Sequence, residues 1–139
     1  MKSINLPIEI AEPSTGMVQA VLSELMQHLQ QLVESGLTHV IDLSSLPMSG
    51  SDRTQLETLL GNGEAEIILT TIGESRIIET AYSGIWWVRH YNLEQQLLAE
   101  LIEIAQVPEI IKSHPADIRQ ALHRLKTTIE LSDQTGEQV

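Results

Sequence analysis

Histidines and carboxylates are the side chains of this sequence that could bind a metal ion or transfer a proton. Cysteine is absent, which excludes a disulfide, a thiolate nucleophile and a thiolate-bound metal or iron–sulfur cluster. Metal-binding histidine pairs often stand at HxH spacing, which puts both on one strand face, or at HxxxH spacing, which puts them one helix turn apart. No two histidines of this sequence have either spacing. The five histidines are His28, His39, His90, His114 and His123. The sequence therefore predicts no local metal site, although distant residues could assemble one.

The sequence supports a catalytic site no better than it supports a metal site. The sequence lacks the GxSxG motif of a nucleophile elbow. Ser44 and Ser45 follow Asp42, but a triad also needs a histidine close in space, which a sequence does not show. Several carboxylates could pair for acid–base chemistry, namely Glu64, Glu66, Glu79, Glu100 and Glu103. Carboxylates spaced two residues apart in a strand, however, more often form a solvated face. We predict no catalytic residue, no cofactor-binding residue and no enzymatic activity.

The aromatic residues are the most informative side chains. Only four are present, and all lie in one short stretch: Tyr82, Trp86, Trp87 and Tyr91. In a strand, Trp86 and Trp87 point to opposite faces, so either both faces are covered or one tryptophan is partly exposed. Both could simply be packing residues. The row Trp87–Arg89–Tyr91, however, has the composition of a protein interface. The predicted partner-binding residues are Trp86, Trp87, Arg89, Tyr91 and Asn92, with Trp87 and Arg89 favoured.

The helices and strands of the chain must position these residues, and in the first half of the sequence the two kinds of element alternate. An apolar stripe from Val18 to Val33 at spacings of three and four predicts a helix, with Ser14 or Thr15 as its cap and Gly36 at its end. A strand is expected over 37–43. Ser49 with Asp52 three residues later predicts a capping box and a second helix, which ends at Gly61-Asn62-Gly63.

The second half is rich in strand-forming residues. Runs at 64–72, 76–82 and 85–91 predict an antiparallel meander, and 97–105 could be a strand or a helix. A last helix is expected to start at Ser113-His114-Pro115. These elements indicate an α+β fold, with an antiparallel sheet of about four to five strands and about three helices packed on it. We expect one domain over residues 1–131 and a flexible tail over 132–139.

Composition limits the classes of partner. The 139 residues carry 19 acidic and 8 basic side chains, for a net charge of −11. This charge disfavours nucleic acid, because phosphate binding requires clustered Lys and Arg. Half of the basic residues lie near the last helix: Lys112, Arg119, Arg124 and Lys126. No signal peptide or membrane span is predicted, so we expect a cytoplasmic protein that does not bind a membrane.

Several short motifs together resemble the hydrogenase expression/formation proteins of the HupH/HyaF type. The resemblance covers about residues 40–111 and rests on the order and spacing of its pieces. They are Asp42-Leu43-Ser44-Ser45-Leu46-Pro47-Met48-Ser49, Asp52-Arg53, Leu59-Leu60-Gly61-Asn62-Gly63-Glu64, Ile78-Glu79-Thr80, Gly84-Ile85-Trp86-Trp87-Val88, Asn92, Glu103-Ile104 and Val107-Pro108-Glu109-Ile110. Typical members are longer and carry two related modules, and Ser83 stands where a proline is common.

This resemblance implies an accessory, chaperone-like factor for maturation of nickel–iron hydrogenase. It implies that the partner is a hydrogenase subunit, above all the iron–sulfur small subunit before export, or another maturation factor. The resemblance brings no catalytic residue and no cofactor. A single module could form a homodimer to recreate a two-module surface. Two other functions stay open: a generic acidic protein-interaction domain, and a small hydrolase that uses Glu79 or Glu103.

Overall fold

The computed structural model describes residues 15–137, which form two compact units. One unit contains the residues up to Pro108, and the other begins at Glu109. Each unit is described by itself.

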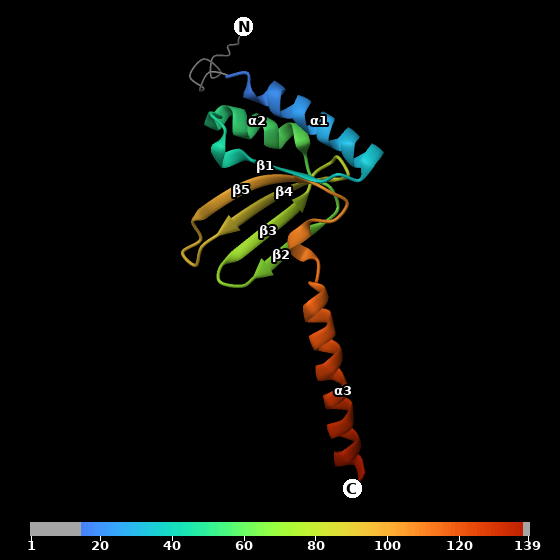
Figure 1. Ribbon diagram of the computed structural model, residues 1–139. Helices are drawn as coiled ribbons and strands as arrows, with labels where there is room; N and C mark the ends of the chain where they lie inside the picture. The colour runs from blue at the N-terminus through green and yellow to red at the C-terminus, as the bar shows by residue number, and fades with distance from the viewer. Residues whose placement is uncertain (1–14, 138–139) are drawn as a thin grey trace. The chain divides into compact units, whose positions relative to one another are not determined.

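The first unit is built on a five-stranded sheet in the order β1-β5-β4-β3-β2 (Figure 1). All neighbouring strands are antiparallel, so the predicted α+β class with an antiparallel sheet is confirmed. The segment that could have been a helix or a strand is a strand, β5. The bounds are β1 His39–Asp42, β2 Glu66–Thr70, β3 Glu74–Glu79, β4 Ile85–Tyr91 and β5 Leu97–Ile104.

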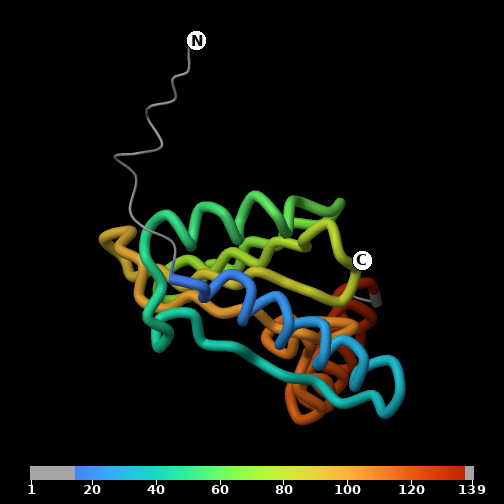
Figure 2. Tube along the Cα trace, turned by 90° about the horizontal axis from the view of Figure 1, so that it is seen from above, coloured from blue at the N-terminus to red at the C-terminus, as the bar shows by residue number. Residues whose placement is uncertain are grey.

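Two helices, α1 (Met17–Ser35) and α2 (Gly50–Leu60), lie side by side over one face of this sheet (Figures 1 and 2). α1 ends as expected at Gly36, whose φ of 72° is left-handed and whose N–H donates to the Leu32 carbonyl. At its start, Gly16 occupies the cap position instead of Thr15, and Ser14 lies outside the described residues. The Thr15 hydroxyl still accepts the Met17 N–H at 3.2 Å.

The predicted capping box opens α2. The Asp52 N–H donates to the Ser49 hydroxyl at 3.0 Å, and the Ser49 N–H donates to the Asp52 carboxylate at 3.1 Å. The same carboxylate accepts a short hydrogen bond from the Thr15 hydroxyl. This bond from Thr15 is the main reason that the pKa of Asp52 is lowered, and the Ser49 bonds add to the effect. Asp52 therefore stabilises the start of α2 and also ties it to Thr15, two residues before α1 begins.

The hydrophobic core lies between the two helices and the sheet. Its fully buried members come from all of these elements: Val21, Leu25, Ile41, Leu43, Leu56, Leu60, Ile85, Trp87, Ile102 and Ile104. Strand pairing brings Trp87 opposite Ile102 on β5 and opposite Ile78 on β3. The row that contains Trp87 is thus the row covered by α1 and α2.

The second unit contains a short 3₁₀ turn, Glu109–Ile111, and the helix α3 (Pro115–Glu137). α3 starts at the expected proline and includes most of the segment 132–139 that was expected to be a flexible tail. Its apolar residues Ile118, Leu122, Leu125 and Ile129 are all exposed and follow a spacing of four, three and four. Among the described residues, no helix is long and apolar enough to cross a membrane.

Candidate functional site

A buried carboxylate lies beside the aromatic strand. Glu100 of β5 is 2% exposed and is paired with Arg89 of β4 in the sheet. One Glu100 oxygen, Oε2, accepts the Trp87 indole N–H at 2.6 Å and the Arg89 Nε–H at 2.8 Å. The other oxygen, Oε1, forms an ion pair with the Arg53 guanidinium of α2. The buried charge is therefore compensated by two arginines and one indole N–H.

Arg89 is held from several directions. Its Nη2 atom donates to the Glu57 carboxylate of α2 at 3.1 Å, and its guanidinium carbon lies 4.9 Å from the centroid of the Trp87 ring. That distance is within range of a cation–π interaction. Arg53 and Glu57 are four residues apart on α2, so one side of this helix supplies a partner for Glu100 and a partner for Arg89. With its side chain only 18% exposed, Arg89 is held in place by these contacts.

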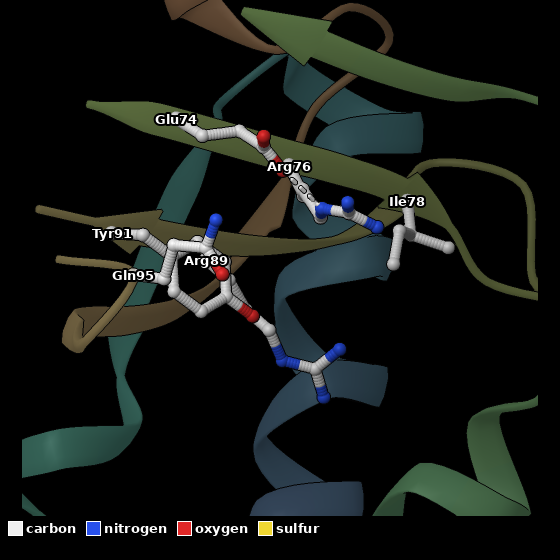
Figure 3. Close-up of a pocket in the computed structure, with 6 residues that line it drawn as sticks. All are labelled: Glu74, Arg76, Ile78, Arg89, Tyr91 and Gln95. Carbon is white, nitrogen blue, oxygen red and sulfur yellow. Dashed lines mark hydrogen bonds and ion pairs between the residues drawn. The ribbon is translucent and has the colours of Figure 1, made fainter. Parts of the chain in front are cut away.

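A pocket of about 310 Å³ opens next to Arg89 (Figure 3). Strands β3 and β4 and the turn after β4 supply its lining: Glu74, Arg76, Ile78, Arg89, Tyr91 and Gln95. Arg76 forms a short ion pair with Glu74 and a longer one, 3.8 Å, with Glu66. The hydrogen bond that the Arg76 guanidinium donates to the Glu74 carboxylate is the largest cause of the raised pKa of Arg76. The pocket thus combines an aromatic ring, an aliphatic side chain and charged groups that are already paired.

The charges around this pocket favour hydrogen bonding to a neutral polar group over anion capture. The three guanidiniums of the region face four carboxylates, so the local sum is not positive: Arg53, Arg76 and Arg89 against Glu57, Glu66, Glu74 and Glu100. An incoming anion would have to displace one of these carboxylates. The geometry therefore suits a protein contact in which Tyr91 packs against the partner and Arg89 donates a hydrogen bond to it.

The structure separates the predicted contact residues. Both tryptophans are buried: Trp87 is 3% exposed and Trp86 is 8% exposed. Trp87, one of the two favoured contact residues, is covered because α1 and α2 pack on its face of the sheet. Trp86 points to the other face, where its indole N–H donates to the Ala105 carbonyl at 3.0 Å. The open alternative, that both tryptophans are packing residues, agrees with their burial.

The remaining three predicted residues lie near one another. Arg89 and Tyr91 line the same pocket, and Asn92 follows directly at the turn between β4 and β5. The Asn92 carboxamide oxygen accepts the Gln96 N–H at 2.9 Å, and its amide group donates to the Gln96 side chain at 2.9 Å. Asn92 thus shapes the turn that carries Gln95 into the pocket. A role of these residues in partner binding stays a prediction.

Sequence reasoning missed two groups of residues. The first is Glu100 with Arg53; the signal for Glu100 was its spacing of two from Ile102, which places it on the inward face of β5. The second is Glu24, His28 and His39, whose potential metal-ligating atoms all lie within 4.8 Å of one another. A search for histidine pairs overlooks the helical spacing of four between Glu24 and His28.

Comparison with known proteins extends the resemblance beyond the motifs. A family model described as "HupH hydrogenase expression protein, C-terminal conserved region" matches residues 17–132, more than the expected 40–111. The hydrogenase expression/formation protein HoxQ of Azotobacter vinelandii is 31% identical over 122 residues, which cover 85% of this chain and 43% of HoxQ. The hydrogenase-1 operon protein HyaF of Escherichia coli K12 is 32% identical over 102 residues, which cover 73% of this chain and 35% of HyaF.

A solved structure shows the same fold. The hydrogenase expression protein HupH from Thiobacillus denitrificans superposes with a TM-score of 0.77 at 36% identity, over 87% of this chain and 99% of that one. By contrast, the chain spans about two fifths of the length of the first two curated relatives it matches, 43% and 38%.

Proposed function

This chain belongs to the HupH family of hydrogenase expression proteins, and we propose that it takes part in nickel–iron hydrogenase assembly by binding a hydrogenase subunit. The proposed partner is the iron–sulfur small subunit, bound in the cytoplasm before export. Support comes from the relatives, which are named hydrogenase expression/formation proteins. Because the chain spans only part of their length, partner and activity are carried over as a proposal.

The proposed contact surface is the rim of the pocket beside Arg89. The observation that carries this choice is that Arg89 and Tyr91, an interface-type pair in the sequence, line one pocket on a rigid support. Arginine and tyrosine are among the residues that contribute most to binding energy at interfaces. Because Glu100 and Glu57 already hold the Arg89 side chain, binding would cost little additional side-chain entropy.

The tryptophans have different roles in this proposal. Trp87 lies beneath Arg89 and positions it through the shared Glu100 carboxylate, so it supports the contact without reaching the partner. Asn92 acts through the turn that presents Gln95. Trp86, on the opposite face of β4, takes no part in this surface.

The test compares two tyrosines that stand on different parts of the first unit. Tyr91→Ala removes the pocket-lining ring, and we expect it to weaken binding of the purified small subunit by about tenfold or more, the cost of a typical interface anchor. Tyr82→Ala is the matched control, because Tyr82 is exposed and belongs to an apolar groove beside α1 instead. Binding is measured by biolayer interferometry, after thermal midpoints show that both variants are folded.

The two variants also distinguish the possible contact surfaces. Loss of binding in Tyr82→Ala alone would move the contact to the groove lined by Leu22, Leu25 and Met26. Binding unchanged in both variants would reject the pocket rim. Failure of the unmodified chain to bind any hydrogenase subunit would instead favour a generic interaction domain.

The net charge of the chain gives a second test of the proposed partner. A net charge of −11 would suit a basic partner segment such as a twin-arginine export signal, and that attraction weakens as salt screens it. Affinity for a small subunit that retains this signal should therefore fall across a salt series from 50 to about 500 mM. Affinity that does not change with salt would remove the electrostatic part of the proposal.

The proposed homodimer would use α3. The 4-3-4 spacing of its exposed apolar residues is that of a coiled-coil seam. Its first half carries three basic residues, Arg119, Arg124 and Lys126, against one acidic residue, Asp117, whereas Glu130 and Asp133 lie in its second half. An antiparallel pair of α3 helices would therefore place opposite charges next to each other. A hydrolase that uses Glu79 is disfavoured, because the Glu79 carboxylate accepts the Glu64 N–H at 3.1 Å and so supports a turn.

A further inference from the structure

Three side chains that could bind a metal ion meet between the middle of α1 and the start of β1. Glu24 and His28 are four residues apart on α1, so they project from neighbouring turns on the same side of the helix. His39 is the first residue of β1. The potential ligand atoms of the three residues all lie within 4.8 Å of one another. All three belong to the first unit.

The connection between the two elements explains why these residues meet. Gly36 adopts a left-handed conformation, ends α1 and lets the chain reverse within a few residues. β1 then runs back beside α1, as the tube view shows (Figure 2). The imidazole rings of His28 and His39 are stacked, with centroids 3.5 Å apart and an angle of 10° between the ring planes.

His28 has a hydrogen bond that prepares it as a ligand. Its Nδ1 atom lies 3.2 Å from the side-chain oxygen of Gln31, one turn further along α1. An amide oxygen only accepts hydrogen bonds, so this contact selects the neutral tautomer in which Nδ1 carries the proton and Nε2 keeps its lone pair. Metal-binding histidines usually donate their second N–H to an oxygen in this way, which fixes the tautomer and the ring orientation.

We propose that Glu24, His28 and His39 form a binding site for a divalent transition-metal ion, with Zn²⁺ as the reference ion. Two imidazole nitrogens and one carboxylate oxygen suit Zn²⁺, Co²⁺ or Ni²⁺ and are poor ligands for Mg²⁺ or Ca²⁺. Three protein ligands leave at least one coordination position for water or for a group from another molecule. The site is independent of the proposed hydrogenase partner.

Binding requires one rotation. In two stacked rings the nitrogen lone pairs lie in separate, nearly parallel planes and do not converge on one ion, so one ring must turn. His39 is exposed, and the terminal torsion of a histidine ring is broad, so this rotation is easy. Metal binding should therefore replace the stacked arrangement with two rings that converge on the ion.

The experiment is a Zn²⁺ titration of the full chain by isothermal calorimetry. We expect the unmodified protein to bind one equivalent at this site, and His28→Gln, His39→Gln and Glu24→Gln each to weaken binding by about tenfold or more. Gln31→Leu tests the positioning bond, and loss of such a bond weakens metal affinity by about 10–100-fold. His123→Gln is the matched control, since it removes an exposed imidazole of α3. Thermal midpoints without metal check that all variants are folded.

A second readout assigns the ligands directly. In NMR spectra, the ring signals of His28 and His39 should shift on addition of Zn²⁺, whereas those of His90 should not. The proposal is overturned if the His28→Gln,His39→Gln double variant binds Zn²⁺ as tightly as the unmodified chain. It is also overturned if His123→Gln loses affinity to the same extent, because binding would then be non-specific.

Discussion

Replacing Glu100 with glutamine tests whether the buried ion network stabilises the first unit. Glu100→Gln keeps the size and shape of the side chain but removes its charge. If the amide oxygen takes the position of Oε2, it can still accept from Trp87 and Arg89. The amide NH₂ then faces the Arg53 guanidinium, so a donor meets a donor where the native chain has an ion pair.

The expected cost follows from these contacts. Breaking a buried ion pair by neutralising one partner costs about 3–5 kcal/mol. Here the penalty is reduced, because the side chain of Arg53 is 37% exposed and Arg89 keeps Glu57 as a second partner. We therefore expect a loss of about 2–3 kcal/mol in the free energy of unfolding, equivalent to a fall of about 10 °C in the thermal midpoint.

Glu57→Gln is the matched control for this substitution. It is the same chemical change in the same network, but the Glu57 side chain is 57% exposed. Solvent-exposed ion pairs contribute about 0–1 kcal/mol, so this variant should remain within about 0.5 kcal/mol of the native protein. The contrast between the two variants isolates the effect of burial.

The measurement is equilibrium unfolding in urea, a neutral denaturant that does not screen ion pairs. Far-UV circular dichroism and the fluorescence of Trp86 and Trp87 should give coincident transitions with an unchanged m-value. A loss below about 0.5 kcal/mol in Glu100→Gln would refute the claim that the network stabilises the fold. Equal losses in the two variants would refute the claim that burial decides the cost.

Two further predictions concern the turn before β4 and the surface of α3. Gly84 has a φ of +93°, and a Cβ there would lie 3.2 Å from a methyl group of Leu29. Gly84→Ala should therefore lower the free energy of unfolding in urea by about 1–2 kcal/mol. Gly136→Ala is the control, because a Cβ there meets nothing within 4 Å and should cause no loss; equal losses in the two variants would contradict this reasoning. If α3 mediates a homodimer, sedimentation of the unmodified protein should give twice the chain mass of 15.5 kDa. Leu125→Lys should return the protein to a monomer, whereas Gln120→Lys, on the polar side of α3, should not. A monomeric unmodified protein would disprove this dimer.

The secondary structure could largely be predicted because its signals are local. The capping box of Ser49 and Asp52 is a bond between residues three apart, and Gly36 ends α1 through its own backbone conformation. Strand alternation likewise placed Arg89 and Tyr91 on one face of β4. Each of these features depends on near neighbours in the chain, so short patterns are enough to find it.

The exposure of the tryptophans could not be predicted in this way. Alternation determined that Trp86 and Trp87 face opposite sides of β4, but not what covers each side. Trp87 is buried because α1 and α2 pack on its face, and its indole N–H then finds Glu100 on the neighbouring strand. One of the favoured contact residues is thus part of the core, and its influence on a contact would pass through Arg89.

The sequence by itself determined the family, the order of helices and strands, and the faces on which the β4 side chains lie. Only the tertiary structure decided which of these faces is covered, that Arg53 of α2 meets the buried Glu100, and that His39 meets Glu24 and His28. The physical reason is that these contacts join residues distant in the chain. Their distances depend on how helices pack on the sheet, and no local periodicity records that packing.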